Sequence, residues 1–127
     1  MIASEQIRSV RQHKGLNARR LAKLAGVSPA EISRLESEHR DPRGDTLQRI
    51  AAALEVSVSF LLHEEDEGLD LPVAIRRQSL RKFQKTATAL TDSQSARLEA
   101  MCVLDSAPES VQGWKDFTEN MVFYNSH

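Results

Sequence analysis

The chain has 127 residues and a mass of 14.2 kDa, with 40% hydrophobic and 28% charged residues, which is the composition of one small folded protein. A single cysteine, Cys102, excludes an internal disulfide, the four histidines are scattered without ligand spacing, and we assign Cys102 to the core. No apolar run approaches the roughly 18 residues of a membrane span, and Glu5 and Arg8 stand where a signal peptide would have its apolar centre. We therefore expect a cytoplasmic protein that makes no contact with a membrane.

Three common motifs of enzymes are absent from the sequence. It contains no glycine-rich phosphate loop, no G-x-S-x-G and no H-E-x-x-H. We therefore expect no catalytic residues, no metal and no cofactor, and a protein that is not an enzyme.

The net charge of −1 hides a strong segregation of charge along the chain. Residues 1–63 carry ten basic and seven acidic side chains, residues 64–71 five acidic ones, residues 72–90 five basic ones, and residues 91–127 two basic and six acidic ones. Gly68 and Pro72 also interrupt the helical pattern around the acidic segment. We predict a first domain over residues 1–63, an acidic linker over residues 64–71 and a second region over residues 72–127.

The first domain begins with two short helices, predicted over about residues 4–14 and 18–25. Gly15 ends the first helix, and Asn17 caps the second. The residues that we place on the inward face of the second helix are Leu21, Leu24 and Ala25.

The third helix has a well-marked start and an unusual surface. Gly26 allows a left-handed turn into it, Ser28 and Glu31 form a capping box, and Pro29 stands at the first helical position. Its large apolar residues are only Ile32 and Leu35, so the opposite face has little to bury. That face consists of Ala30, Ser33, Arg34 and Ser37.

Two further helices complete the first domain. The segment HRDPRGD ends the third helix, and Asp45 or Thr46 caps a fourth, after which Ser57 or Ser59 starts a short fifth. The residues that we place inward in the fourth helix are Leu47, Ile50, Ala51 and Leu54, and the short fifth helix lies around Phe60, Leu61 and Leu62.

Two short helices joined by a glycine turn follow the helix-turn-helix plan, in which the second helix lies in the DNA major groove. The segments GLNARRLAKLAGVSPAEISRLES and DPRGDTLQRIAAALEVSVSFLL, within residues 5–63, resemble the five-helix DNA-binding domain of the lambdoid-repressor and Cro class, also called the XRE class. The resemblance implies an all-α, five-helix repressor-type bundle that binds double-stranded DNA. It also implies that Glu36 is a structural acid paired with Arg11.

The resemblance and the free face of the third helix together suggest the DNA contacts. Arg34 can bind guanine through two hydrogen bonds, Pro29 and Ala30 can meet a thymine methyl, and Ser33 can contact a base or a phosphate. The backbone contacts that we expect come from Asn17, Arg19, Arg40 and Arg43. Arg43 could also enter the minor groove, and Arg19 or Arg20 could replace the contact of a glutamine that is frequent in the class where this chain has Ala18.

The second region carries three apolar stripes. The first, within a helix flanked by the basic run at 76–85, consists of Val73, Leu80, Phe83, Ala87 and Leu90. The second, in a helix that Thr91, Asp92 and Ser93 cap, consists of Met101, Val103 and Leu104. The third, after Pro108, consists of Val111, Trp114, Phe117, Met121 and Tyr124. We interpret the basic run as the polar flank of an interface helix; the alternative is a second DNA contact.

About fifty residues form a marginal domain alone, so we expect the stripes to pack across a twofold axis or onto another protein. The alternative is that they pack on the first domain. The dimer or partner interface that we predict consists of Leu80, Phe83, Val111, Trp114, Phe117 and Met121.

These features predict a sequence-specific transcriptional regulator, a homodimeric repressor on a palindromic operator, whose C-terminal helices serve dimerisation or regulation. A toxin, an antirepressor or a protease is the kind of regulatory protein that the second region would meet. One alternative is an antitoxin whose second half binds a toxin and whose first half represses its own operon. Another is an adaptor that docks proteins without binding DNA.

Overall fold

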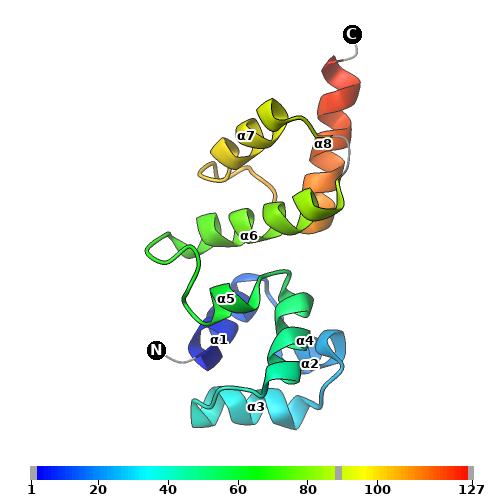
Figure 1. The fold of residues 1–127 in the computed structure, drawn as a ribbon. Helices are drawn as coiled ribbons and strands as arrows, with labels where there is room; N and C mark the ends of the chain where they lie inside the picture. Colours follow the sequence, from blue (N-terminus) through cyan, green and yellow to red (C-terminus); the bar gives the residue numbers. More distant parts are fainter. Residues whose placement is uncertain (1–2, 88–89, 126–127) are drawn as a thin grey trace. The chain divides into compact units, whose positions relative to one another are not determined.

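The computed structural model describes residues 3–87 and 90–125, with side chains up to residue 120, and every element within these ranges is a helix (Figure 1). The chain divides into two compact units, residues 1–68 and 69–127. The boundary between them falls within the acidic segment 64–71. The predicted all-α fold is confirmed.

The first unit contains five helices, α1 (Ala3–His13), α2 (Ala18–Ala25), α3 (Pro29–Glu38), α4 (Gly44–Leu54) and α5 (Val58–Leu61). Helix α2 packs against α3 and α4, and α1 packs against α3, α4 and α5. The core residues include Ile7, Val10, Leu21, Ile32, Leu35, Ile50 and Leu54. The inward positions predicted for Leu21, Ile50 and Leu54 are therefore confirmed.

Short polar side chains cap three helices of the first unit, α2, α3 and α5. Asn17 Oδ1 accepts the N–H of Arg20 at 2.7 Å, and Ser28 Oγ accepts the N–H of Glu31 at 3.2 Å. Ser57 Oγ likewise accepts the N–H of Phe60 at 2.9 Å. Each cap satisfies a backbone donor that has no partner within the helix. Gly26, at φ 72°, makes the left-handed turn between α2 and α3 as predicted.

Two details of the first unit differ from the sequence predictions. Leu24 is 48% exposed, because Leu21, Ala22 and Ala25 already fill the buried side of α2. Helix α4 begins at Gly44 with Arg43 as its N-cap and without a side-chain cap bond, so Asp45 and Thr46 lie inside the first turn. The carboxylate of Asp45 there still favours the helix, because it faces the positive end of the helix dipole.

The predicted pair of Arg11 and Glu36 is present. Arg11 donates through Nε and Nη2 to the two carboxylate oxygens of Glu36 at 2.8 and 2.6 Å, and through Nη1 to the carbonyl of Leu16 at 2.7 Å. Both side chains are largely buried, with 13% and 11% exposure. This bidentate pair ties α1 to α3 and so holds the third helix from its inner side.

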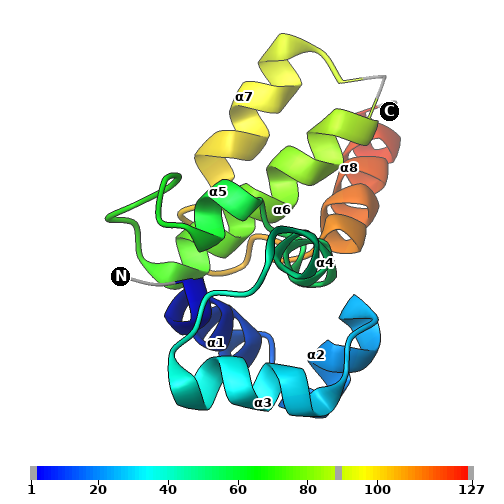
Figure 2. The same ribbon diagram turned by 60° about the horizontal axis from the view of Figure 1, so that its bottom comes forward.

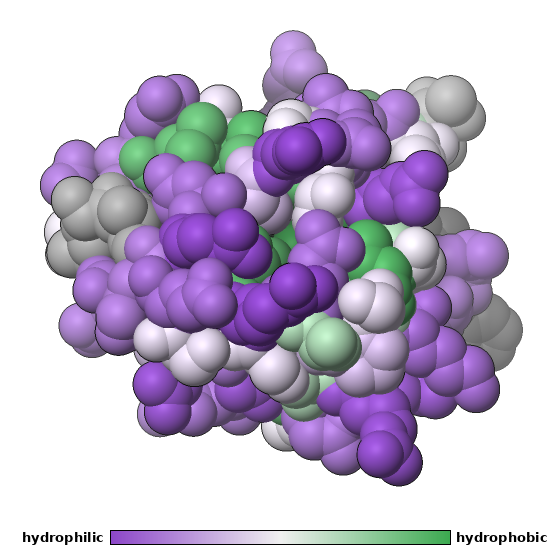
Figure 3. Space-filling model, turned by 90° about the horizontal axis from the view of Figure 1, so that it is seen from below, coloured by the Kyte–Doolittle hydropathy of each residue, from purple (hydrophilic) through white to green (hydrophobic). Residues whose placement is uncertain are grey.

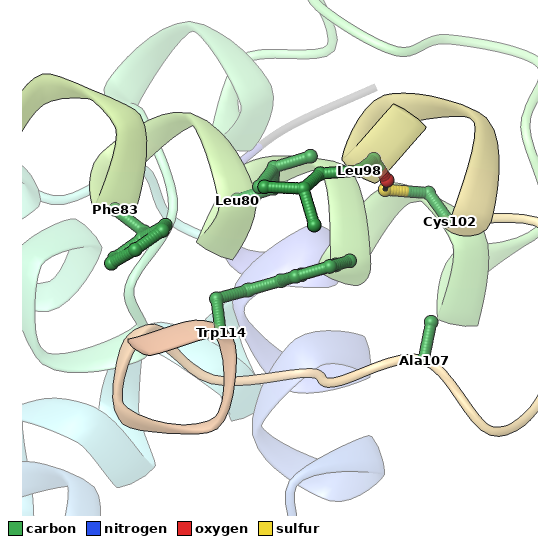
Figure 4. Close-up of a cluster of buried hydrophobic side chains, with 6 residues drawn as sticks. All are labelled: Leu80, Phe83, Leu98, Cys102, Ala107 and Trp114. Atoms are coloured by element: carbon green, nitrogen blue, oxygen red, sulfur yellow. Dashed lines mark hydrogen bonds between the residues drawn. The ribbon is translucent and has the colours of Figure 1, made fainter. Parts of the chain in front are cut away.

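The second unit consists of α6 (Leu71–Thr86), α7 (Asp92–Met101) and α8 (Val111–Asn125), and α6 packs against both of the others. Thr91 caps α7 as predicted, and its capping-box partner is Gln94. The cluster of buried residues in this unit consists of Leu80, Phe83, Leu98, Cys102, Ala107 and Trp114 (Figure 4). The assignment of Cys102 to the core is therefore confirmed.

Trp114 is completely buried in this cluster. Its indole N–H lies 3.0 Å from Ser79 Oγ and 3.2 Å from the carbonyl oxygen of Arg76, and its ring meets that of Phe117 edge to face at 6.0 Å. These bonds satisfy the only polar group of the side chain, so the largest residue of the unit can lie in its interior.

Arg76 is also buried, although the sequence placed it on a polar flank. It donates from Nη1 to the carbonyl oxygen of Cys102 at 3.3 Å, and Glu109 and Asp105 approach the guanidinium at 3.4 and 3.8 Å. The arginine thus holds the connection between α7 and α8, because the last carbonyls of α7 need donors there.

The ends of α6 and α7 also differ from the predicted stripes. Helix α6 stops at Thr86, so Ala87 and Leu90 lie beyond it, and α7 stops at Met101, so Val103 and Leu104 lie in a turn and are 67% and 48% exposed. Of the predicted interface residues, Leu80, Phe83 and Trp114 belong to the unit's own core, and Val111 and Phe117 are partly buried against it. The side chains of Met121 and Tyr124 lie outside the described residues.

Candidate nucleic-acid interface

Helices α2 and α3 are joined by a short turn, Gly26 to Ser28, and pack against each other (Figure 2). Two hydrogen bonds are formed at this turn. The N–H of Val27 donates to the carbonyl of Ala22 at 3.0 Å, and the guanidinium of Arg49, from α4, donates to the carbonyl of Gly26 at 3.4 Å. The bond from Val27 closes the turn, and the longer bond from Arg49 adds a weak contact to α4. Sequence reasoning missed the role of Arg49, because only the packing of α4 against α2 brings this arginine to the turn.

Helix α3 separates cleanly into a buried and an exposed side. Ile32 and Leu35 are 0% and 3% exposed, and Glu36 is held by Arg11. The residues of α3 that were predicted to contact bases, Pro29, Ala30, Ser33 and Arg34, are all exposed, as is Ser37. The guanidinium of Arg34 lies back along the helix, with Nε 3.4 Å from the carbonyl of Ala30. At that length the bond is weak, so the side chain can turn outward at little cost.

The four predicted backbone contacts lie at exposed positions around this helix. Arg19 follows the cap of α2, and Arg40 and Arg43 flank the connection from α3 to α4. Asn17 is exposed too, but its amide oxygen already caps α2, so its NH₂ group is the part that can still donate. Arg40 Nε forms an exposed ion pair with Glu38 at 2.9 Å, and a phosphate would compete with this carboxylate.

Seen from below, the surface is mostly hydrophilic, with near-neutral side chains and a few smaller hydrophobic patches among the polar ones (Figure 3). Such a surface suits the polar and charged backbone of a nucleic acid. Within the part of the chain that the structure describes, no group of three histidine, cysteine, aspartate or glutamate side chains could hold a metal ion. None of the helices described there is long and apolar enough to cross a membrane.

In the first unit a turn containing glycine joins two short helices, and the second of them has an exposed polar face. Three further helices complete the unit. This arrangement is that of a helix-turn-helix domain of the repressor type. The comparison of families agrees: the profile of the helix-turn-helix family matches residues 7–61. Residues 7–61 of the first unit therefore form a helix-turn-helix domain similar to those of the XRE class.

Three curated relatives match part of the chain. The HTH-type transcriptional regulator SinR of Bacillus licheniformis is 36% identical over 64 residues, which are 50% of this chain and 58% of SinR. The HTH-type transcriptional repressor RghR of Bacillus subtilis (strain 168) is 36% identical over 61 residues, 47% of this chain and 45% of RghR. The HTH-type transcriptional regulator PuuR of Escherichia coli (strain K12) is 29% identical over 76 residues, 60% of this chain and 41% of PuuR. The chain thus spans about half the length of the curated relatives it matches.

A solved structure of a SinR protein/SinI protein complex also resembles the chain. The two are 23% identical, the alignment covers all of both chains, and the TM-score is 0.48.

Proposed function

We propose that this protein is a sequence-specific DNA-binding transcriptional regulator, which acts as a dimeric repressor on a palindromic operator and carries out no catalysis. The observation that carries the proposal is the exposed face of α3. Ala30, Ser33 and Arg34 are exposed on a helix whose other side is fixed by Ile32, Leu35 and the pair of Glu36 with Arg11. The helix-turn-helix match over residues 7–61 and the transcriptional regulators to which the chain is similar support the same function.

In this proposal the residues of α3 read the bases. Arg34 donates two hydrogen bonds to O6 and N7 of a guanine, and the small side chains of Pro29 and Ala30 admit a thymine methyl. Ser33 contacts a base or a phosphate. A helix held from its inner side suits this role, because the outward groups then keep a defined register in the groove.

The basic residues around α3 position the domain on the phosphates. Arg19, Arg40 and Arg43 supply charge, Asn17 supplies its NH₂ group, and these contacts are independent of sequence. Arg40 exchanges Glu38 for a phosphate on binding.

The first test is a selection of bound genomic fragments with the full chain, followed by binding measurements with Arg34→Ala. We expect this variant to lose about 1–3 kcal/mol of specific binding and to relax the preference at one base pair of each half-site. Arg43→Ala should instead weaken all sites alike and lower the salt slope by about one unit. Arg97→Ala, at an exposed position of α7, is the matched control and should bind like the parent chain.

Unchanged affinity and preference in Arg34→Ala would show that α3 is not the recognition helix. A chain that selects no fragment at low salt would support the adaptor function instead.

The dimer is tested by footprinting the selected operator. We expect an inverted repeat whose half-site centres lie about 34 Å apart, one helical turn, or a multiple of it. The partly buried Phe117 of the second unit, which does not line the pocket at the start of α8, is the candidate for the dimer or partner interface. A single asymmetric half-site bound by one chain would contradict the dimer, and a toxic reading frame beside the gene would favour the antitoxin function.

A further inference from the structure

The second unit has an open pocket of about 490 Å³, formed by the end of α6, the start of α7 and the first turns of α8. Its walls are mostly apolar and include Phe83, Ala87, Leu90 and Val111. Phe83 also belongs to the buried cluster, where it lies at the opposite end from Ala107 (Figure 4). The core therefore reaches the surface at this point, in a space of the size that small molecules occupy, about 300–1,000 Å³.

Polar side chains from α6, α7 and α8 line the rest of the pocket. The hydroxyls of Thr86 and Thr118 donate to carbonyls of their own helices, at 2.9 Å to Phe83 and 2.8 Å to Trp114, so toward a ligand they act as acceptors. The amide oxygen of Gln94 accepts the N–H of Thr91 at 3.0 Å, so its NH₂ group is the half that donates. The pocket thus offers both donors and acceptors.

The two charged residues of the pocket carry opposite charges, so their sum is zero. They are Lys115 and Glu119, four residues apart on α8 and both exposed. An anionic ligand would meet the carboxylate of Glu119, and a cationic one would meet the ammonium of Lys115. A neutral ligand avoids both conflicts, because its hydroxyl or amide head can use the uncharged donors and acceptors instead.

We propose that this pocket binds a small neutral amphiphile, with its apolar body against Phe83 and Val111 and a hydroxyl or amide head at Gln94 and Thr118. The ligand class follows from the apolar walls, the neutral polar groups and the balance of the two charges. The proposal does not depend on DNA binding by the first unit.

The chain contains its own reporter for this pocket. Trp114 is the single tryptophan, and it lies on α8 three residues after Val111 and four before Thr118, which both line the pocket. Residues at these spacings are neighbours on a helix. A ligand that displaces Phe83 or Val111 therefore changes the surroundings of the Trp114 ring, and its fluorescence follows the binding.

The test titrates the full-length chain with three probes of equal chain length: 1-octanol, octanoate and octylammonium. We expect a saturable, one-to-one change of Trp114 fluorescence with 1-octanol and a binding at least tenfold weaker for each ion. Val111→Phe fills the pocket and should weaken the binding of 1-octanol at least tenfold. Val103→Phe places the same change at a position that is 67% exposed and outside the pocket, and it should bind like the parent chain.

A second variant keeps the test decisive if Val111→Phe does not fold. Lys115→Glu changes an exposed residue and leaves two carboxylates at the pocket. The affinity for octylammonium relative to that for 1-octanol should therefore rise at least fivefold. Lys23→Glu makes the same change on α2 of the first unit and should leave the preference unaltered.

Three results would overturn the proposal. The first is no saturable change with 1-octanol up to its solubility limit, and the second is tighter binding of either ion by the parent chain. The third is self-association, seen by sedimentation, that removes 1-octanol binding as the protein concentration rises; a second copy of the chain would then be the occupant.

Discussion

The two units reach a stable core by different means. In the first unit the fully buried side chains of α1 to α4 are almost all apolar, and each recurs at helical spacing. In the second unit the centre is a tryptophan whose indole N–H is bonded to Ser79 and to the backbone of Arg76, and the arginine itself is buried beside it. Periodicity of hydrophobic residues therefore describes the first core well and the second one poorly.

The difference has a physical basis. An apolar side chain is buried by any apolar surroundings, so its position on a helix suffices to predict it. A buried arginine or indole needs donors and acceptors at defined places, and these come from other helices. Substitutions in the core of each unit should therefore show how much of that unit's stability depends on the residue replaced.

The largest expected effect is that of Trp114→Ala. Removal of this buried ring should cost about 3–5 kcal/mol, because it leaves a cavity and takes away the indole N–H that donates to Ser79 Oγ and to the carbonyl of Arg76. Hydrogen exchange would show lost protection in α6, α7 and α8 and unchanged protection in α1 to α4. Loss of protection in both units alike would show that they fold as one body and would break the comparison.

The next effect is that of Glu36→Gln in the first unit. This change keeps the shape of the side chain but removes the charge that receives two bonds from Arg11, and it should cost about 1.5–3 kcal/mol. Urea unfolding of the full chain measures the loss. Glu38→Gln removes a carboxylate of the exposed pair with Arg40, so its cost should stay within about 0.5 kcal/mol. Equal losses in both variants would contradict the structural role of Glu36.

A comparable but smaller effect is expected for Arg76→Met in the second unit. Methionine replaces much of the buried stem, while the carbonyl of Cys102 loses its donor, and the cost should be about 1–3 kcal/mol. Arg97→Met, on the exposed side of α7, should leave the urea midpoint unchanged. A variant as stable as the parent chain would show that the connection between α7 and α8 needs no arginine.

The smallest losses of stability are expected for removal of a helix N-cap, and they should be equal in the two units. Ser28→Ala and Thr91→Ala each remove one N-cap, and each should cost about 1 kcal/mol, because a cap acts only on its own helix start. Ser33→Ala, at an exposed mid-helix position, should be neutral or slightly stabilising. Thermal unfolding measures all three. Unequal losses at the two caps would show that tertiary contacts modify one of them.

Sequence alone determined the features that depend on near neighbours. The caps at Asn17, Ser28 and Thr91 and the glycine turn at Gly26 lie where the sequence placed them, because each involves residues within four positions. The free face of α3 was predictable for the same reason, since only two large apolar residues share that helix. The resemblance to the repressor class added the pairing of Arg11 with Glu36.

Only the tertiary structure decided the features that depend on distant partners. It buried Arg76 under the connection between α7 and α8, exposed Val103 and Leu104 in a turn, and brought Arg49 to the carbonyl of Gly26. It also placed Trp114 inside the second unit, where the sequence had suggested an interface. An amphipathic or polar side chain can face water or the core with similar local cost, so the bonds that the rest of the fold offers determine which of the two it does.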